Sequence, residues 1–190
     1  MNAFIDPPKR ILFFLRFGIW ISRKVTKKEM LVAKLLSWYP KAAFGSAMLE
    51  SFVAHHDKSI SDRILKLIRM QASFATSCPF CIDMNSFEYG KLGISSRELS
   101  VLKNQSDTAN VDTFTKREKL AVEYTRMISA APLDFPAEFI RELKEEFTNR
   151  DIVILASTSA QVNYWARLCS ALGVPPAGFT EECNIGHMDP

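Results

Sequence analysis

Residues 78–85 of this chain read Cys-Pro-Phe-Cys-Ile-Asp-Met-Asn, and this stretch is the most informative one for both fold and chemistry. Two cysteines three positions apart on a helix place their sulfurs within one turn, where a disulfide can close. Pro79 suits the first helical position because its missing N–H would have no partner there. We therefore expect Cys78 to be the N-cap and Cys81 to lie in the first turn. The helix dipole and unpaired N–H groups lower a thiol pKa at that end, which predicts a redox-active dithiol.

Helical signals continue on both sides of the motif. Apolar residues after Ser61 recur at helical spacing, and Ser95 with Glu98 and Thr115 with Glu118 have the spacing of capping boxes. No convincing alternating strand is present, so the predicted fold class is all-α. Helices are predicted over residues 9–24, 27–38 and 41–57, and over 64–74 after a cap near Ser61. Further helices are expected from 79 to about 93, from 95 through 102, after 115, from 136, and from about 148 to 172.

Composition bounds the class of protein. The 190 residues are 47% hydrophobic with seven glycines and nine prolines, which is typical of a compact globular chain. We expect an N-terminal helical arm over residues 1–40, a helical domain over 41–176 and a C-terminal tail over 177–190. The formal net charge of the chain is only +3, and a cluster of basic residues lies before position 30. Because no nucleic-acid-binding motif accompanies this cluster, we interpret it as the solvated surface of an N-terminal arm.

Residues 11–21 are apolar apart from Arg16 and Gly18, which resembles a targeting segment. The stretch is too short to span a bilayer, and no small-residue cleavage site follows it. We therefore expect an amphipathic helix that packs on its own core or on a partner subunit, without stable membrane contact. The chain is expected in the cytoplasm, where a Cys-x-x-Cys pair is more often catalytic than structural. Many aromatic and aliphatic residues before position 40 predict self-association.

The cysteine pair is also compatible with other kinds of site. A thioredoxin-type site requires a strand before the motif, whereas the preceding residues have a helical period. A structural zinc site requires four ligands, and Cys169 and Cys183 are not spaced as a second pair. Both cysteines of the motif could also be buried packing residues. A redox dithiol on a helical scaffold is the preferred interpretation, without metal or organic cofactor.

The motif, with Gly-Lys-Leu-Gly-Ile-Ser at residues 90–95, resembles the signature of the alkylhydroperoxidase D and carboxymuconolactone decarboxylase superfamily. The stretch Ala-Gln-Val-Asn-Tyr-Trp-Ala-Arg at 160–167 is similar to the closing helix of many members. The resemblance covers roughly residues 45–175. It implies an all-α fold, assembly as trimers or hexamers, and a dithiol that reduces peroxides in many members.

The resemblance also assigns roles to residues. The two thiols match Cys78 and Cys81, but Asn85 stands at the position of the family's relay histidine and Lys66 at that of its glutamate. Asn85 can orient a thiolate but cannot act as a base, and Lys66 would stabilise a thiolate as a cation. The resemblance implies that Cys81 attacks peroxide and Cys78 resolves the sulfenic acid. Helix electrostatics alone favours Cys78 as the attacking thiol, but we follow the resemblance and expect Cys81 to attack.

We therefore predict a thiol-dependent, peroxidase-like oxidoreductase that uses a small hydroperoxide and an external dithiol reductant. The alternatives are a carboxymuconolactone-decarboxylase-like lyase and a non-catalytic redox-sensing or assembly protein. Cys169 is expected to be a buried hydrophobe and Cys183 an incidental thiol. The prediction requires that the sulfurs of Cys78 and Cys81 lie close enough to join and be reachable from solvent.

Overall fold

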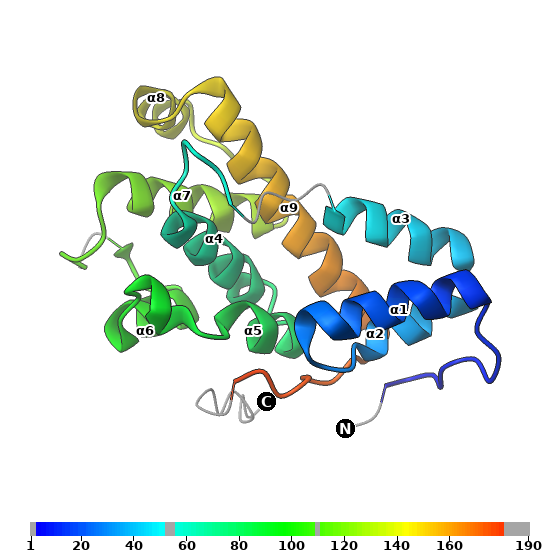
Figure 1. Cartoon of the computed structure of the whole chain (residues 1–190). Helices are drawn as coiled ribbons and strands as arrows, with labels where there is room; N and C mark the ends of the chain where they lie inside the picture. The colour runs from blue at the N-terminus through cyan, green and yellow to red at the C-terminus, as the bar shows by residue number, and fades with distance from the viewer. Residues whose placement is uncertain (1–2, 52–55, 109–110, 181–190) are drawn as a thin grey trace.

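The computed structural model describes residues 3–51, 56–108 and 111–180, and all regular structure in these ranges is helical (Figure 1). The α-helices are α1 (Phe13–Thr26), α2 (Leu31–Leu35), α3 (Pro40–Ser51), α4 (Asp62–Ala75), α5 (Pro79–Ser86), α6 (Ser96–Lys103), α7 (Lys116–Ser129), α8 (Ala137–Glu146) and α9 (Asn149–Ala171). The described ranges also contain the 3-10 turns η1 (Leu36–Trp38) and η2 (Tyr89–Leu92). The predicted all-α fold class is confirmed.

Helix α4 is the centre of the fold and packs against α5, α7 and α9. Figure 1 shows the 23-residue α9 crossing the molecule, with α7 and α4 on one side and α3 on the other. The apolar stripe of α4 predicted from helical spacing is buried, including Ile64, Leu65 and Ile68. The dithiol helix α5 lies against both α4 and α9, so its position depends on this central packing.

Both predicted capping boxes form, and one arginine joins them. Glu98 at the start of α6 and Glu118 at the start of α7 each bind the N-cap backbone of their own helix. Arg63 of α4 donates to both carboxylates, from Nη2 to Glu98 over 2.6 Å and from Nε to Glu118 over 2.7 Å. Both carboxylates are buried, so this ion-pair network links the N-termini of α6 and α7 to α4.

The helix boundaries near the dithiol differ from the prediction in one place. We expected the helix from Pro79 to reach Gly93, but α5 ends at Ser86. Phe87 has a ψ of 127°, outside the helical region, and Glu88 has a left-handed φ of 56°, so the helix does not continue through them. Gly93 still ends a helical segment, because it caps η2 with a φ of 69°.

The first two predicted helices also shift. The first runs from Phe13 to Thr26 and ends where Lys27 takes a left-handed φ of 56°. The second is shorter than 27–38 and continues as the 3-10 turn η1. Val32 and Leu35 are buried in the same apolar cluster as the two motif cysteines. Part of the segment expected to be an arm therefore belongs to the core around the dithiol.

In the part of the chain that the structure describes, no helix combines the length and apolarity needed to cross a bilayer.

Candidate active site

The site is built at the N-terminus of α5, as the sequence predicts. Cys78 is the N-cap residue, Pro79 occupies the first turn, and the N–H of Cys81 donates to Sγ of Cys78 over 3.3 Å. The Sγ atoms of Cys78 and Cys81 lie 2.8 Å apart and are unbonded. A disulfide is 2.03–2.05 Å long, so only a small movement separates the two thiols from a covalent bond.

The pKa values of the two thiols are shifted in opposite directions. Hydrogen bonding from the Cys81 thiol, the backbone N–H groups of Cys81 and Phe80, and the Ser170 hydroxyl lower the pKa of Cys78 to about 7, against the opposing effect of burial. The pKa of Cys81 is raised well above its ordinary value, first by its hydrogen bond with Cys169, then by Cys78 and by burial. The electrostatics therefore places the thiolate on Cys78 and keeps the proton on Cys81. This order agrees with the helix argument and is opposite to the one that the resemblance implies.

A shell of apolar residues covers the dithiol within the single chain. Cys78 is 1% exposed and Cys81 is 0% exposed, so the requirement that both sulfurs be reachable from solvent is not met in this conformation. The sequence could not reveal this burial, because the covering residues come from both ends of the chain. The cluster around the cysteines includes Val32, Leu35 and Leu36 from the N-terminal region and Val174 from the C-terminal region.

The C-terminal part of this cover is tied to the dithiol helix itself. Asp83, two residues after Cys81, is buried and accepts hydrogen bonds from the backbone N–H groups of Ala177, Phe179 and Thr180 at 2.8, 3.1 and 2.9 Å. The Thr180 hydroxyl donates to the same carboxylate over 2.9 Å. Residues 174–180, called the C-terminal strap below, therefore close over α5 through one carboxylate.

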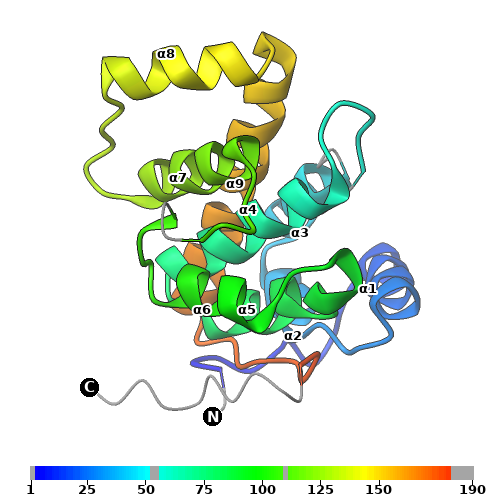
Figure 2. The same cartoon turned by 90° about the vertical axis from the view of Figure 1, so that its left-hand side faces the viewer.

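The N-terminus reaches the same side of the molecule. The N–H of Phe4 donates to the carbonyl oxygen of Leu172 over 3.0 Å, and Ala3 packs against the cluster that contains the cysteines. Figure 2 shows the N-terminal segment and the C-terminal strap running along the bottom of the molecule, beneath α5 and α2. Access to the dithiol from this side therefore requires that one of these two segments move.

The two predicted relay positions lie elsewhere in the site. Asn85 donates from Nδ2 to the Ser73 hydroxyl over 2.9 Å, which links α5 to α4. Lys66 donates from Nζ to the carbonyl oxygen of Phe87 over 2.6 Å, beyond the C-terminal end of α5. An eight-residue helix is about 12 Å long, so this ammonium is at the opposite end from the thiols. Burial lowers the pKa of Lys66 to about 8. Their roles in catalysis stay predictions.

Two residues near the thiols were not assigned to the site from the sequence. Cys169 of α9 is buried as expected, but it shares the cluster of Cys81 and raises the pKa of that thiol. The neighbouring Ser170 is exposed and helps to lower the pKa of Cys78. The signal for both is weak in the sequence, because adjacent residues on one helix normally point in different directions. In the described residues, no group of three or more His, Cys, Asp or Glu side chains has a metal-binding arrangement.

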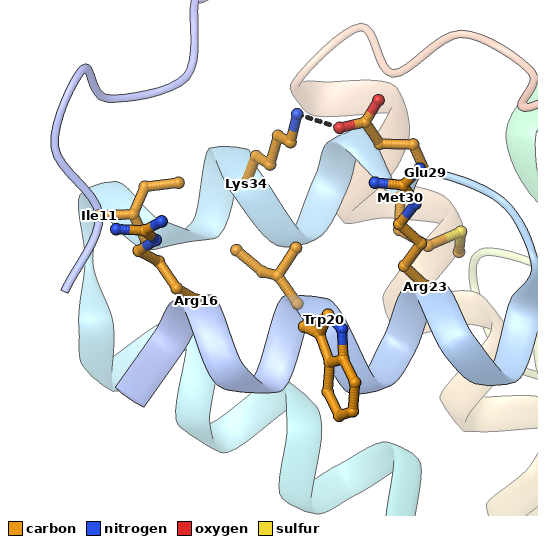
Figure 3. Close-up of a pocket in the computed structure, with 8 residues that line it drawn as sticks. Ile11, Arg16, Trp20, Arg23, Glu29, Met30 and Lys34 are labelled. Carbon is orange, nitrogen blue, oxygen red and sulfur yellow. Dashed lines mark ion pairs between the residues drawn. The ribbon is translucent and has the colours of Figure 1, made fainter. Parts of the chain in front are cut away.

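A pocket of about 230 Å³ lies between α1 and α2, apart from the dithiol (Figure 3). Arg16, Trp20 and Arg23 of α1 line one wall, and Lys34 on the other wall pairs with Glu29. None of the cysteines lines this pocket. We therefore place the candidate active site at the three buried sulfurs.

Comparisons with known proteins agree with the fold. No family model matches the chain. The uncharacterized Bacillus subtilis protein YdfG is 25% identical over 144 residues, which cover 75% of this chain and 96% of YdfG. The alkylhydroperoxidase AhpD core structure of a peroxidase-related protein from Ralstonia eutropha superposes with a TM-score of 0.76 at 14% identity, covering 92% of both chains. The debrominase Bmp8, as a cysteine-to-alanine variant in complex with 2,3,4-tribromopyrrole, gives a TM-score of 0.74 at 16% identity and covers 91% of both chains.

This chain therefore has the alkylhydroperoxidase D-like helical fold. It is the fold expected from the resemblance of residues 78–85 to the signature of that superfamily. Its structural neighbours include proteins described as peroxidase-related and one described as a debrominase.

Proposed function

We propose that the protein is a thiol-dependent oxidoreductase that reduces small hydroperoxides through Cys78 and Cys81. The observation that carries this proposal is the pair of free sulfurs 2.8 Å apart at the N-terminus of α5, one favouring the thiolate and the other the thiol. Thiolates attack peroxide, and a second thiol nearby converts the resulting sulfenic acid into a disulfide.

The opposite pKa shifts of Cys78 and Cys81 allow the reaction to proceed without the family's relay histidine and glutamate. The Cys78 thiolate attacks one peroxide oxygen, the O–O bond breaks, and the leaving alkoxide takes the proton held by Cys81. The Cys81 thiolate then attacks the sulfenic sulfur of Cys78 and releases hydroxide. The sum is one hydroperoxide and one thiol–thiolate pair converted to an alcohol, a hydroxide ion and a disulfide. An external dithiol then reduces the disulfide.

Hydroperoxide consumption with a dithiol reductant tests the proposal. We expect turnover by the wild type, none by Cys78→Ser, and one stoichiometric oxidation of Cys78 without turnover in Cys81→Ser. A trapped sulfenic acid on Cys78 in that variant supports this order. A sulfenic acid on Cys81 in Cys78→Ser, formed at the wild-type rate, would restore the order that the resemblance implies. Wild-type activity in both variants would refute the dithiol mechanism.

A redox-sensing or assembly protein is the second candidate, and the burial of both cysteines favours it. In that case the disulfide forms slowly and its effect is a rearrangement of the cover. A protein that forms the disulfide but does not consume hydroperoxide catalytically is expected under this candidate. Because the debrominase Bmp8 is a structural neighbour and is described in complex with 2,3,4-tribromopyrrole, loss of bromide from this compound is a further assay for the same dithiol.

Asn85 and Lys66 enter this proposal as secondary residues. An imidazole placed by Asn85→His, four positions after Cys81, is expected to raise the rate with peroxide near neutral pH if that position faces the thiols. An unchanged rate would assign Asn85 to the Ser73 contact alone. Lys66→Met is expected to change thiol reactivity less than Ser170→Ala, because Ser170 contacts Cys78 directly.

Self-association is also part of the proposal. The 14-residue α1 has no buried residue, and its Phe13 and Val25 are 85% and 76% exposed, while Phe17 stacks on Trp20. A second copy of this chain is the occupant we propose for this face, in a trimer or hexamer in a cytoplasmic setting. Sedimentation velocity is expected to give a smaller assembly for Phe17→Ser/Trp20→Ser. Val153→Ser, which removes an exposed apolar residue from α9, serves as the control.

A further inference from the structure

Cys169 places a third thiol against the dithiol. It is fully buried near the end of α9 and belongs to the same apolar cluster as Cys78 and Cys81, where it raises the pKa of Cys81. Cys81 therefore has a sulfur neighbour on each side, Cys78 from its own helical turn and Cys169 from α9. The mechanism above uses only the first of these neighbours.

We propose that Cys169 is a second resolving thiol, which exchanges with the Cys78–Cys81 disulfide to form a Cys81–Cys169 disulfide and release Cys78. The step is an internal thiol–disulfide exchange, so it needs no further oxidant. The Cys169 thiolate attacks Sγ of Cys81, the Cys78–Cys81 bond breaks, and Cys78 leaves as a thiolate. The departing Cys78 sulfur, which lies in the same buried cluster, takes the proton lost by Cys169. The inference rests on the proposed function only for the origin of the first disulfide.

The direction of the exchange follows from the leaving group. In thiol–disulfide exchange, the sulfur of lower pKa leaves faster. Cys78 has that property, because the first turn of α5 and the Ser170 hydroxyl stabilise its thiolate. The packing also favours attack on Cys81, since Cys169 shares its buried cluster, α9 packs against α5, and the interaction of Cys169 is with the Cys81 thiol.

The exchange changes what the oxidised protein presents. A Cys81–Cys169 bond would join α5 to α9, and both of its sulfurs are 0% exposed. Cys78, the sulfur that hydrogen-bonds to the exposed Ser170, would be free again. The oxidising equivalent is then stored in a buried bond, and Cys78 becomes the thiol through which an external dithiol recovers it.

Disulfide mapping after oxidation tests the proposal. Cys183 is replaced by serine in every protein, because trypsin leaves it in the same peptide, residues 168–190, as Cys169. Cys78 and Cys81 share the peptide of residues 70–91. The full-length protein is oxidised with one equivalent of diamide, quenched in acid, unfolded, alkylated and digested. Diamide is used because it does not require peroxide turnover, so the result is independent of whether the proposed function holds.

We expect the two peptides to become linked, with the alkyl label on Cys78, after an early phase in which residues 70–91 carry an internal disulfide and Cys169 carries the label. Cys169→Ala should lose the linked species completely and keep the internal disulfide. Cys78→Ala should form the linked species directly. Circular dichroism and thermal unfolding check that each variant folds.

Full alkylation of Cys169 in the oxidised parent protein at all times would overturn the proposal. Failure of the folded Cys78→Ala variant to link Cys81 to Cys169 would do the same. A separate arm with a hydroperoxide in place of diamide reports on the proposed function. Linked peptides with diamide but none with hydroperoxide would leave the exchange standing and remove the peroxide step.

Discussion

The backbone N–H of Cys81 donates to the Sγ atom of Cys78 over 3.3 Å, so the first turn of α5 solvates a thiolate three residues before it. Because the pKa of Cys78 is lowered to about 7, we expect its alkylation rate to rise with pH to a midpoint near pH 7. Cys81→Ala should shift the midpoint upward, since the thiol of Cys81 is the largest stabilising contribution. Stopped-flow alkylation with peptide mapping measures both. A wild-type midpoint near pH 9 would contradict this assignment.

The same acidity affects folding. A thiol whose pKa is lower in the folded state favours folding when it is ionised. The contribution of Cys78 is therefore complete above about pH 9, the ordinary thiol value, and is lost as the pH falls through about 7. Urea unfolding of the reduced protein is expected to show a gain in the free energy of unfolding between pH 7 and 9. Cys78→Ala should reduce this gain, and an equal gain in that variant would count against it.

Asp83 is expected to control access to the dithiol. Asp83→Asn removes the charge that binds three backbone N–H groups and a hydroxyl of the C-terminal strap. Hydrogen bonds to charged groups contribute about 1.5–3 kcal/mol each, so we expect a loss of stability of about 2 kcal/mol or more. The strap should loosen and Cys78 should alkylate faster at constant pH.

Asp134→Asn is the matched control, because Asp134 is exposed. It should leave both stability and alkylation rate near the wild type. If Asp83→Asn lowers stability without accelerating alkylation of Cys78, the strap is structural and does not gate the site.

Arg63 is the shared cation of two buried ion pairs. Arg63→Met leaves the buried carboxylates of Glu98 and Glu118 without their shared cation, and breaking a buried pair costs about 3–5 kcal/mol. Arg141→Met removes the exposed pair with Glu138 and should cost less than about 1 kcal/mol. Urea denaturation of both variants gives the comparison. Similar losses in the two variants would show that the buried network contributes no more than a surface pair.

The local part of the site could be predicted from the sequence. The cap at Cys78, the proline after it and the two glutamate capping boxes depend on residues within one helical turn of each other, and all of them form as expected. The all-α class follows from the same kind of local signal. Where a local signal failed, as at Phe87 and Glu88, backbone angles outside the helical region ended α5 before the expected glycine.

The parts that escaped prediction depend on long-range packing. Cys169 lies 88 positions after Cys81 (169 minus 81), and nothing in its own neighbourhood indicates that it contacts the motif. Asp83 similarly finds its partners in the strap, more than ninety residues away. Single-sequence patterns report periodicity and caps, but which helix faces meet is decided by the packing of the whole core.

Gly173 lies against the ring of Phe4, at the place where the N-terminal segment meets the end of α9. Gly173 has a left-handed φ of 65°, and a Cβ there would lie 2.6 Å from the Phe4 ring. Gly173→Ala therefore combines backbone strain, about 1 kcal/mol, with displacement of Phe4 from its place beside Leu172. Gly178→Ala is the matched control, since Gly178 has a φ of 72° but open space around it. The two variants should lose similar stability from strain, and only Gly173→Ala should disturb the N-terminal segment.

Amide hydrogen exchange at Phe4 separates these effects, because its N–H donates to the carbonyl of Leu172. We expect faster exchange in Gly173→Ala than in the wild type or in Gly178→Ala, together with faster alkylation of Cys78. In a Phe4→Ala background, Gly173→Ala should add only the strain, since the ring it would meet is gone. Unchanged exchange at Phe4 in Gly173→Ala would mean that the ring adjusts in place. Access to the thiols would then be controlled by the strap and Asp83, without the N-terminus.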